Sequence, residues 1–440
     1  LIVSGRRLFG WGWLAHRTLA VRSLHLGVEG EGWSRRLPVT HGFARDDVAR
    51  AFPGFTDAAT AGFVVTGFVP PSAARSFRLH VTFEDGSESA IELEGMAEDG
   101  RRRPARRRTW LQLARGLLRR LRTRDFSGLL RAHRDRRMPL LDEERLADSL
   151  IQPLRRARAV RMIFDHDMGG GANHYRRERI ARWLAAGDCG VLCTYHLPTL
   201  DYRFHRMGGG EEATFRASSF VALESVIREA PVVELFVNST VSFDDPMLFA
   251  DWLARMRLAY PGVRLTVTLH DYFSACPSFV LLDADGRHCG VPPPAECARC
   301  LGRHEAAHMA LSPPAEIGPW REAWGRCLRA ADEILCFSEA SRRLLLRAHP
   351  GLERTSLVPH VSDYVPARRP SVDPAAPLVI RVLGTIDFPK GAAIGTGIVR
   401  RRDRDRSDAR VVVLGTHNPA CHSRRLGVTG PFDRRALPDL

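Results

Sequence analysis

Lysine is almost missing from this 440-residue sequence: Lys390 is the only one, and the other 64 of the 65 Lys and Arg residues are Arg. The net charge of +15 is also unevenly placed, because residues 101–137 contain fifteen Arg and only two acidic residues. The basic character therefore belongs mainly to one segment, and the remainder of the chain is close to neutral. We attribute the use of Arg in place of Lys to genomic base composition.

Long hydrophobic runs are missing too. No apolar stretch approaches the roughly 18 residues that a membrane-spanning helix needs, and Arg6, Arg7 and Arg17 interrupt the stretch where a signal peptide would lie. The nine cysteines are an odd number, which together with the lack of an export signal predicts free thiols in a reducing cytoplasm. Because the first residue is Leu1 and not Met, we expect a piece of a longer protein.

Two common nucleotide-binding patterns are also lacking. Gly169, Gly170 and Gly171 follow a short apolar run at 160–164 and precede a helical pattern. They lack the spacing of the dinucleotide fingerprint, and no Gly-Lys-Ser/Thr follows, which disfavours hydride-transferring enzymes and P-loop NTPases. A strand, a glycine turn and a helix still aim backbone N–H groups at an anion. We interpret the stretch as a candidate phosphate site; the alternative is a tight turn without a ligand.

Residues 1–98 have the patterns of β-strands. The segments 78–83 and 90–93 alternate apolar and polar residues on either side of the turn signal Asp85-Gly86. We predict a small antiparallel β-sandwich that serves as an accessory module. The stretches 46–53 and 61–63 resemble small β modules appended to bacterial sugar-modifying transferases, so the module either binds glycan or only spaces and docks other domains.

Residues 99–157 are predicted to be a basic, partly helical linker. Trp110, Leu113, Leu117 and Leu121 recur at helical spacing, with Arg on the opposite face. Such a helix can make peripheral contact with an anionic membrane surface. The alternative is a solvated connector, which is what charge runs more often are. No recognised motif supports binding to nucleic acid, so none is expected.

From residue 160 onward, strand patterns alternate with helix patterns, which predicts a mostly parallel, doubly wound sheet over residues 158–365. Ligands of such sheets bind beyond the carboxyl ends of the strands. This rule places the glycine turn, His270-Asp271 and Ser338-Glu339 on one rim, because each follows a predicted strand. The predicted strands are 160–164, 190–195, 232–237, 264–269, 333–337 and 355–358, and the predicted helices are 175–186, 220–229, 246–260, 320–331 and 340–349.

A proline-rich stretch at 366–377 predicts a hinge. After it, a strand at 378–383, a loop with Gly384 and Lys390, and a strand at 410–414 indicate the start of a second α/β unit, residues 378–440. About 68 residues follow residue 372, too few for a complete Rossmann-like domain, so we expect this unit to be truncated.

The order of these motifs is similar to that of a known family. The stretches 169–175, 268–272, 336–341 and 384–391 together resemble the retaining glycosyltransferases of the two-Rossmann GT-B type, in the large family four. The resemblance covers about residues 158–440. It implies transfer of a sugar from a nucleotide-sugar donor to a cell-envelope glycan or lipid-linked acceptor, with retention of configuration and without a catalytic metal. N–H groups and a cation would stabilise the departing diphosphate.

The resemblance also implies roles for single residues. His270 lines the sugar and acceptor site and is the candidate catalytic residue, and Lys390 stands where the family binds diphosphate with Lys. The alternatives are a His packed at a strand end and an exposed loop Lys. For Asp271 the alternative is to orient its loop, and for Ser338 it is a helix N-cap. The candidate substrate- and donor-binding residues are Gly169, Gly170, Gly171, Asn173, Asp271, Ser338, Glu339, Gly384 and Lys390.

The sequence departs from the family pattern in two places. Thr385 follows Gly384 where the family commonly has Arg, and the family's paired glutamates, which hold the donor, would lie beyond Leu440. We therefore keep a second hypothesis, a catalytically inactive glycan- or membrane-docking protein derived from a glycosyltransferase. In either case we expect a cytoplasmic protein, with residues 101–137 as the part that reaches the inner face of the membrane.

Four cysteines form a separate pattern in the loop after His270. Their C-x12-C-x7-C-x2-C spacing can close a tetrahedral zinc site, whose role would be structural because four thiolates leave no open position. Such a site would order a long insertion that has little core of its own. The alternative is four reduced thiols, some of them buried. The residues are Cys276, Cys289, Cys297 and Cys300.

Overall fold

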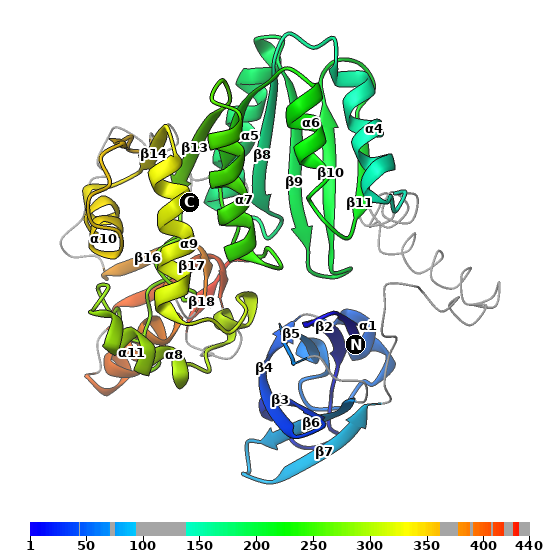
Figure 1. Cartoon of the computed structure of the whole chain (residues 1–440). Coiled ribbons are helices and arrows are strands. Elements are labelled where there is room, and N and C mark those ends of the chain that lie inside the picture. Colours follow the sequence, from blue (N-terminus) through cyan, green and yellow to red (C-terminus); the bar gives the residue numbers. More distant parts are fainter. Residues whose placement is uncertain are drawn as a thin grey trace.

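The computed structural model describes residues 1–43, 45–70, 75–93, 138–360, 377–387, 390–405, 408–417 and 426–430. In these ranges the strands form sheets of seven, eight and three strands (Figure 1). The predicted basic helix within 101–137 and nearly all of the predicted hinge lie outside the described residues. Within them, no helix combines the length and the apolar character that crossing a bilayer requires.

The N-terminal sheet is antiparallel and continuous, with the order β1-β2-β5-β4-β3-β6-β7. The predicted β-sandwich is therefore not confirmed as two separate sheets. β4 explains the difference: residues 33–39 pair with β3, while residues 40–43 pair with β5 across a register shift, so one strand serves both halves. Figure 1 shows the sheet curling around. Its elements are β1 (Ile2–Ser4), β2 (Arg7–Trp13), β3 (Val21–Gly30), β4 (Trp33–Phe43), α1 (Asp46–Ala51), η1 (Ala58–Thr60), β5 (Gly62–Phe68), β6 (Arg75–Phe83) and β7 (Glu88–Leu93).

The eight-stranded sheet has the order β11-β10-β9-β8-β12-β13-β14-β15. In this order the strands from β9 to β15 run parallel, as predicted, and β10 and β11 add an antiparallel hairpin at one edge that the sequence analysis did not predict. The predicted strands are confirmed to within a few residues. The strands of this sheet are β8 (Val160–His166), β9 (Cys189–His196), β10 (Asp201–Met207), β11 (Ala213–Ala217), β12 (Val232–Val237), β13 (Arg264–Leu269), β14 (Glu333–Cys336) and β15 (Thr355–Leu357).

Helices cover both faces of this sheet, and β8 shows how the sequence directs them. Ile163 faces α5, whose Ile180 and Trp183 pack against it. Its neighbours Met162 and Phe164 point to the opposite face and join the core built with α4, α6, α7 and α9. The helices are α4 (Glu143–Leu154), α5 (Gly171–Ala185), α6 (Leu223–Glu229), α7 (Pro246–Ala259), α8 (Pro294–Gly302), η2 (Ala307–Leu311), α9 (Ile317–Ala330) and α10 (Glu339–Ala348).

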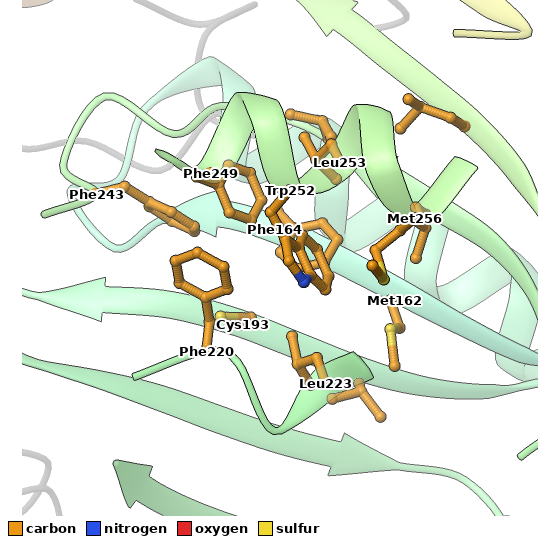
Figure 2. Close-up of a cluster of buried hydrophobic side chains, with 14 of the residues drawn as sticks. Met162, Phe164, Cys193, Phe220, Leu223, Phe243, Phe249, Trp252, Leu253 and Met256 are labelled. Carbon is orange, nitrogen blue, oxygen red and sulfur yellow. The ribbon is translucent and has the colours of Figure 1, made fainter. Parts of the chain in front are cut away.

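The main core lies between β8 and α7 (Figure 2). The sequence pattern predicts that the stripe Phe249, Trp252, Leu253 and Met256 on α7 is core, and all four side chains are buried. Phe164 meets Phe249 at a ring-centroid distance of 4.9 Å and an interplanar angle of 62°. Burying each of these large side chains contributes roughly 1.5–3 kcal/mol, so this contact holds the helix layer to the sheet.

Helix α4 belongs to the α/β unit, although the sequence analysis placed it in the linker. Asp142 caps it by accepting a hydrogen bond from the Arg145 N–H at 2.9 Å. Leu146, Leu150 and Leu154 recur on one face and are fully buried in the main core. The α/β unit therefore already includes residue 143, because this apolar face packs into the core of that unit.

The three-stranded sheet contains the predicted strands near 378–383 and 410–414. Its parallel order is β16-β17-β18, and α11 accompanies it. Gly415 has a φ of +137°, and a Cβ there would lie 2.1 Å from the carbonyl oxygen of Gly384, so the two strands approach too closely for any other residue. The elements are β16 (Val379–Ile386), α11 (Ala392–Arg404), β17 (Arg410–His417) and β18 (Gly427–Val428).

Arg7 on β2 joins the N-terminal sheet to the α/β unit. Its guanidinium is completely buried and donates to the carbonyl oxygens of Phe243 at 3.3 Å and Leu311 at 3.2 Å. It also lies 4.3 Å from the ring centroid of Phe68. Burial lowers its pKa, while the charge of Asp244 opposes that change. One buried cation thus satisfies acceptors on two segments of the α/β unit.

Replacing Arg7 with Ala should lower the free energy of unfolding by about 2–4 kcal/mol, because one buried and one partly buried carbonyl lose their donor and a cavity is left. Urea denaturation of the full chain measures this. Arg6→Ala is the matched control, since Arg6 is exposed and surface substitutions usually change stability by less than about 0.5 kcal/mol. Equal effects of the two substitutions would contradict the role assigned to Arg7.

Candidate functional site

The candidate site lies at the carboxyl ends of β8 and β12, where the order in which strands are added to the main sheet switches from one side of β8 to the other. From β8 the chain goes to β9 on one side, and it later returns to β12 on the other side of β8. Loops leaving the carboxyl ends of β8 and β12 therefore diverge, and this is where open α/β sheets bind ligands. The glycine turn follows β8, Asn238 and Ser239 follow β12, and His270 follows β13.

The glycine turn is shaped by left-handed backbone and by Asn173. Gly169 and Gly170 have φ values of +82° and +89°, which glycine adopts without strain. The Gly169 N–H donates to the Asn173 side-chain oxygen at 2.6 Å, and the Asn173 amide donates to Asp165 at 2.8 Å. Asn173 is 2% exposed. Asn173, which was predicted to bind the donor, is therefore buried beneath the turn and holds it by hydrogen bonds.

Open space lies above the turn. A Cβ placed on Gly169, Gly170 or Gly171 would meet nothing within 4 Å. Helix α5 begins at Gly171 without a side-chain cap, so the N–H groups of its first turn have no partner within the helix. These N–H groups and the positive end of the helix dipole make the turn suited to an anion.

A buried ion pair supports the turn. Asp165 is fully buried at the end of β8 and accepts from the Arg176 guanidinium on α5 at 2.7 Å. Burial raises the pKa of Asp165, and the charge of Arg176 and the neighbouring amides oppose that change. The Nε of Arg176 is buried without a partner in the described residues. The pair fixes the first two turns of α5 against the strand that precedes the glycines.

Asn238 connects the glycine turn to His270. Its side chain is completely buried at the end of β12. Its Nδ2 donates to the carbonyl oxygen of Ala172 in the first turn of α5 at 2.9 Å, and its Oδ1 lies 3.1 Å from the His270 Nε2. The glycine turn and His270 are thus held together by the side chain of Asn238, the residue that follows β12.

His270 is held as a neutral imidazole among aromatic rings. Burial, together with the neighbouring His360 and His166, lowers its pKa to about 3. Its ring stacks on Phe337 at 4.5 Å and meets Tyr175 edge-on at 5.1 Å. Phe337 stacks in turn on His360 at 4.1 Å. At neutral pH this residue is therefore a hydrogen-bonding group and not a cation.

The residues around His270 mostly hold local structure. Asp271 accepts from the Ser239 hydroxyl at 2.6 Å and from the Phe273 N–H at 2.9 Å, so it orders the loop and does not contact His270 by a described hydrogen bond. Burial raises its pKa. Ser338 is the N-cap of α10 and accepts from the Ser341 N–H at 3.1 Å, which is the simpler of the two roles considered for it.

Glu339, Gly384 and Lys390, the remaining predicted binding residues, make fewer contacts with the rest of the candidate site. Glu339 lies in the first turn of α10 and accepts from Arg342 at 3.5 Å. Gly384 lies near the end of β16 with a φ of +109°, and Lys390 is exposed just before α11, its N–H donating to the Asp387 carbonyl oxygen. Among the described residues, no hydrogen bond or ion pair joins Lys390 to the glycine turn or to His270.

The four cysteines of the insertion lie in and around a small apolar cluster. Cys276 and Cys297 are buried with Leu281, Val291 and Ile317, and Cys289 packs against them. Burial raises the pKa of the Cys276 thiol to about 12. In the part of the chain that the structure describes, no group of three or more His, Cys, Asp or Glu side chains is placed to hold a metal ion. The zinc site stays a prediction from spacing.

Sequence reasoning missed several residues of this site. Asn238 and Ser239 follow the predicted strand 232–237, so the rule that ligands gather beyond strand ends would have selected them. Asp165 directly follows the predicted strand 160–164, so the same rule would have selected it; in the structure β8 extends to His166. The ring cluster of Tyr175, Phe337 and His360 arises from three separate elements and has no linear signature.

In an NMR titration, the ring signals of His270 should stay constant from pH 8 to about 4.5, because its pKa is about 3. An unfolded chain has a His pKa near 6.5 and binds the proton more readily, so this residue should favour unfolding as pH falls from about 6.5 towards 3. The His270→Gln variant assigns the signal and should show a weaker loss of stability in that window. A midpoint near 6.5 would contradict the buried neutral state.

If the cysteine spacing does specify zinc, metal analysis of the purified full chain should find about one zinc per chain, and chelation should lower its melting temperature. Cys300→Ala should abolish the metal. Cys189→Ala is the control, because this buried thiol lies on β9 outside the pattern. A folded chain without metal would remove the zinc prediction.

Comparisons with known proteins give little family information. No protein family model matches the chain, and no curated protein matches it. Among solved structures, the chain is similar to the apo form of the lipopolysaccharide outer core galactosyltransferase WaaB, with 10% sequence identity and a TM-score of 0.36. That similarity covers 64% of this chain and 70% of the other.

Proposed function

We propose that this protein is a glycosyltransferase that moves a sugar from a nucleotide-sugar donor to a cell-envelope glycan or lipid-linked acceptor. The observation that carries the proposal is the shared anchor at Asn238, which holds an anion-suited glycine turn and a neutral imidazole side by side at the switch point of a parallel sheet. An anion subsite next to a hydrogen-bonding subsite suits a ligand that is phosphate at one end and sugar at the other.

The glycine turn would stabilise the leaving group. When the bond from the sugar to the diphosphate breaks, negative charge grows on the departing oxygen. The first N–H groups of α5 point out of the helix end, and open space above Gly171 lets a phosphate approach the backbone. Because Asp165 and Arg176 hold the turn rigidly, little reorganisation would accompany the reaction.

His270 would orient the reacting sugar. As a neutral imidazole it can hydrogen-bond a sugar hydroxyl without carrying charge to the acceptor. Lys390 and Gly384 in the second unit would contribute to the diphosphate site when the two units close on the donor. Retention of configuration and chemistry without a catalytic metal are part of the proposal through the family resemblance.

A second candidate is a non-catalytic glycan-docking protein. The tryptophans of β2 favour it, because Trp11 is 60% exposed and Trp13 is 42% exposed on the same side of the strand. Phe52 supports Trp13 at a centroid distance of 5.3 Å. Exposed aromatic side chains mark interaction surfaces. Glycan binding without turnover of any nucleotide sugar would favour this candidate.

Gly171→Ala should weaken binding of a nucleoside diphosphate by about tenfold or more without destabilising the fold. Position 171 has ordinary backbone and open surroundings, so a methyl group costs nothing in packing and raises helix propensity. The methyl group would instead occupy the space of the phosphate. Calorimetric titration of the full chain with UDP, GDP and ADP measures the effect.

Gly318→Ala is the matched control, because Gly318 also lies in the first turn of a helix, α9, and a Cβ added there would likewise meet nothing within 4 Å. Hydrolysis or transfer should then be assayed with the corresponding glucose conjugates. If the wild-type chain binds none of the diphosphates, or binds equally well after Gly171→Ala, the glycine turn is not the phosphate site and the proposal fails.

A further inference from the structure

We propose that Asn238 is a positioning residue: it fixes His270 in the tautomer with the proton on Nε2, so that Nδ1 is the acceptor for a ligand hydroxyl group beside the glycine turn. This inference deepens the proposed function and rests on it, since it names the chemistry of the second subsite. The ligand class is a hydroxyl-rich group joined to phosphate.

The orientation of the Asn238 amide follows from its partners. Nδ2 has two hydrogens, and the described acceptors are the carbonyl oxygen of Ala172 at 2.9 Å and the carboxylate of Asp165. Turning the amide over would place Oδ1 against these two oxygens, which cannot donate. Oδ1 must therefore face His270, and this contact uses the remaining polar atom of the side chain.

The tautomer of His270 follows from the same contact. Oδ1 of an amide only accepts hydrogen bonds, so the His270 Nε2 at 3.1 Å must carry the hydrogen. In a neutral imidazole the other nitrogen then carries the lone pair. Nδ1 is thus an acceptor, and it suits a neutral hydroxyl donor better than a phosphate oxygen.

The backbone of Asn238 is also fixed, so the side chain has little freedom to follow a moving imidazole. Its N–H donates to the Phe164 carbonyl oxygen on β8 at 2.8 Å, and its carbonyl oxygen accepts from the Thr268 hydroxyl on β13 at 2.7 Å. Phe337 and Tyr175 restrict the ring of His270 on its other sides. These buried hydrogen bonds hold the Asn238 side chain in one arrangement.

The test begins with the ligand-free full chain. Two-dimensional NMR of the imidazole nitrogens should show His270 with the proton on Nε2. Asn238→Ala should give a mixture of tautomers, because the Nε2 hydrogen then loses the acceptor that holds it. Thr268→Val is the control, because it removes a hydrogen bond to the Asn238 backbone and leaves the amide in place.

Binding measurements then separate the two subsites. UDP, GDP and ADP are compared with their glucose conjugates. Asn238→Ala should reduce the extra affinity of the conjugate by about tenfold, while Thr268→Val should leave it unchanged. A proton on Nδ1 in the wild-type chain would overturn the inference, as would an unchanged tautomer in Asn238→Ala. If the tautomers behave as expected but no nucleotide binds, the proposed function fails and the tautomer assignment stands.

Discussion

The parallel pairing of β8 with β12 determines where the parts of the candidate site meet. It brings Phe164 beside Val237, so the residues that follow each strand emerge at one edge of the sheet. Only because these strands are neighbours can Asn238 reach the first turn of α5, which the chain enters directly after β8. β13 lies next to β12 in the same direction and delivers His270 to that edge. The chemistry of the site thus depends on strand order before it depends on any single side chain.

The periodic parts of this architecture could be predicted from the sequence. The runs at 232–237 and 264–269 match β12 and β13 residue for residue, because β-branched and other apolar residues dominate both runs and polar residues follow them. The hairpin β10–β11 was missed because Arg203, His205 and Arg206 give it a polar appearance. The predicted β-sandwich is not confirmed: one sheet continues through β4, and bends and register shifts within a strand leave no periodic signal in the sequence.

In the candidate site, too, the positions of some residues could be predicted from the sequence, whereas their roles could not. The glycine turn and His270 were found because each stands at a strand end, and the structure joins them through Asn238. Whether a polar side chain faces the ligand or supports the loop could not be read from spacing: Asn173 holds the turn and Ser338 caps a helix. These roles depend on which partner is within hydrogen-bond distance, and that is a property of three dimensions.

The contact at Arg7 has a consequence for how the two parts of the chain evolve. Its acceptors are main-chain oxygens, at Phe243 and Leu311, so changes of side chain at those two positions do not remove them. The α/β unit can therefore vary its surface widely while keeping its partner, provided that the loop geometry survives. On the side of the β module, by contrast, the contact depends on the Arg7 side chain itself, because only a long cationic side chain reaches both oxygens. A recombination event that exchanged this module for another would have to supply an equivalent charge at the same depth.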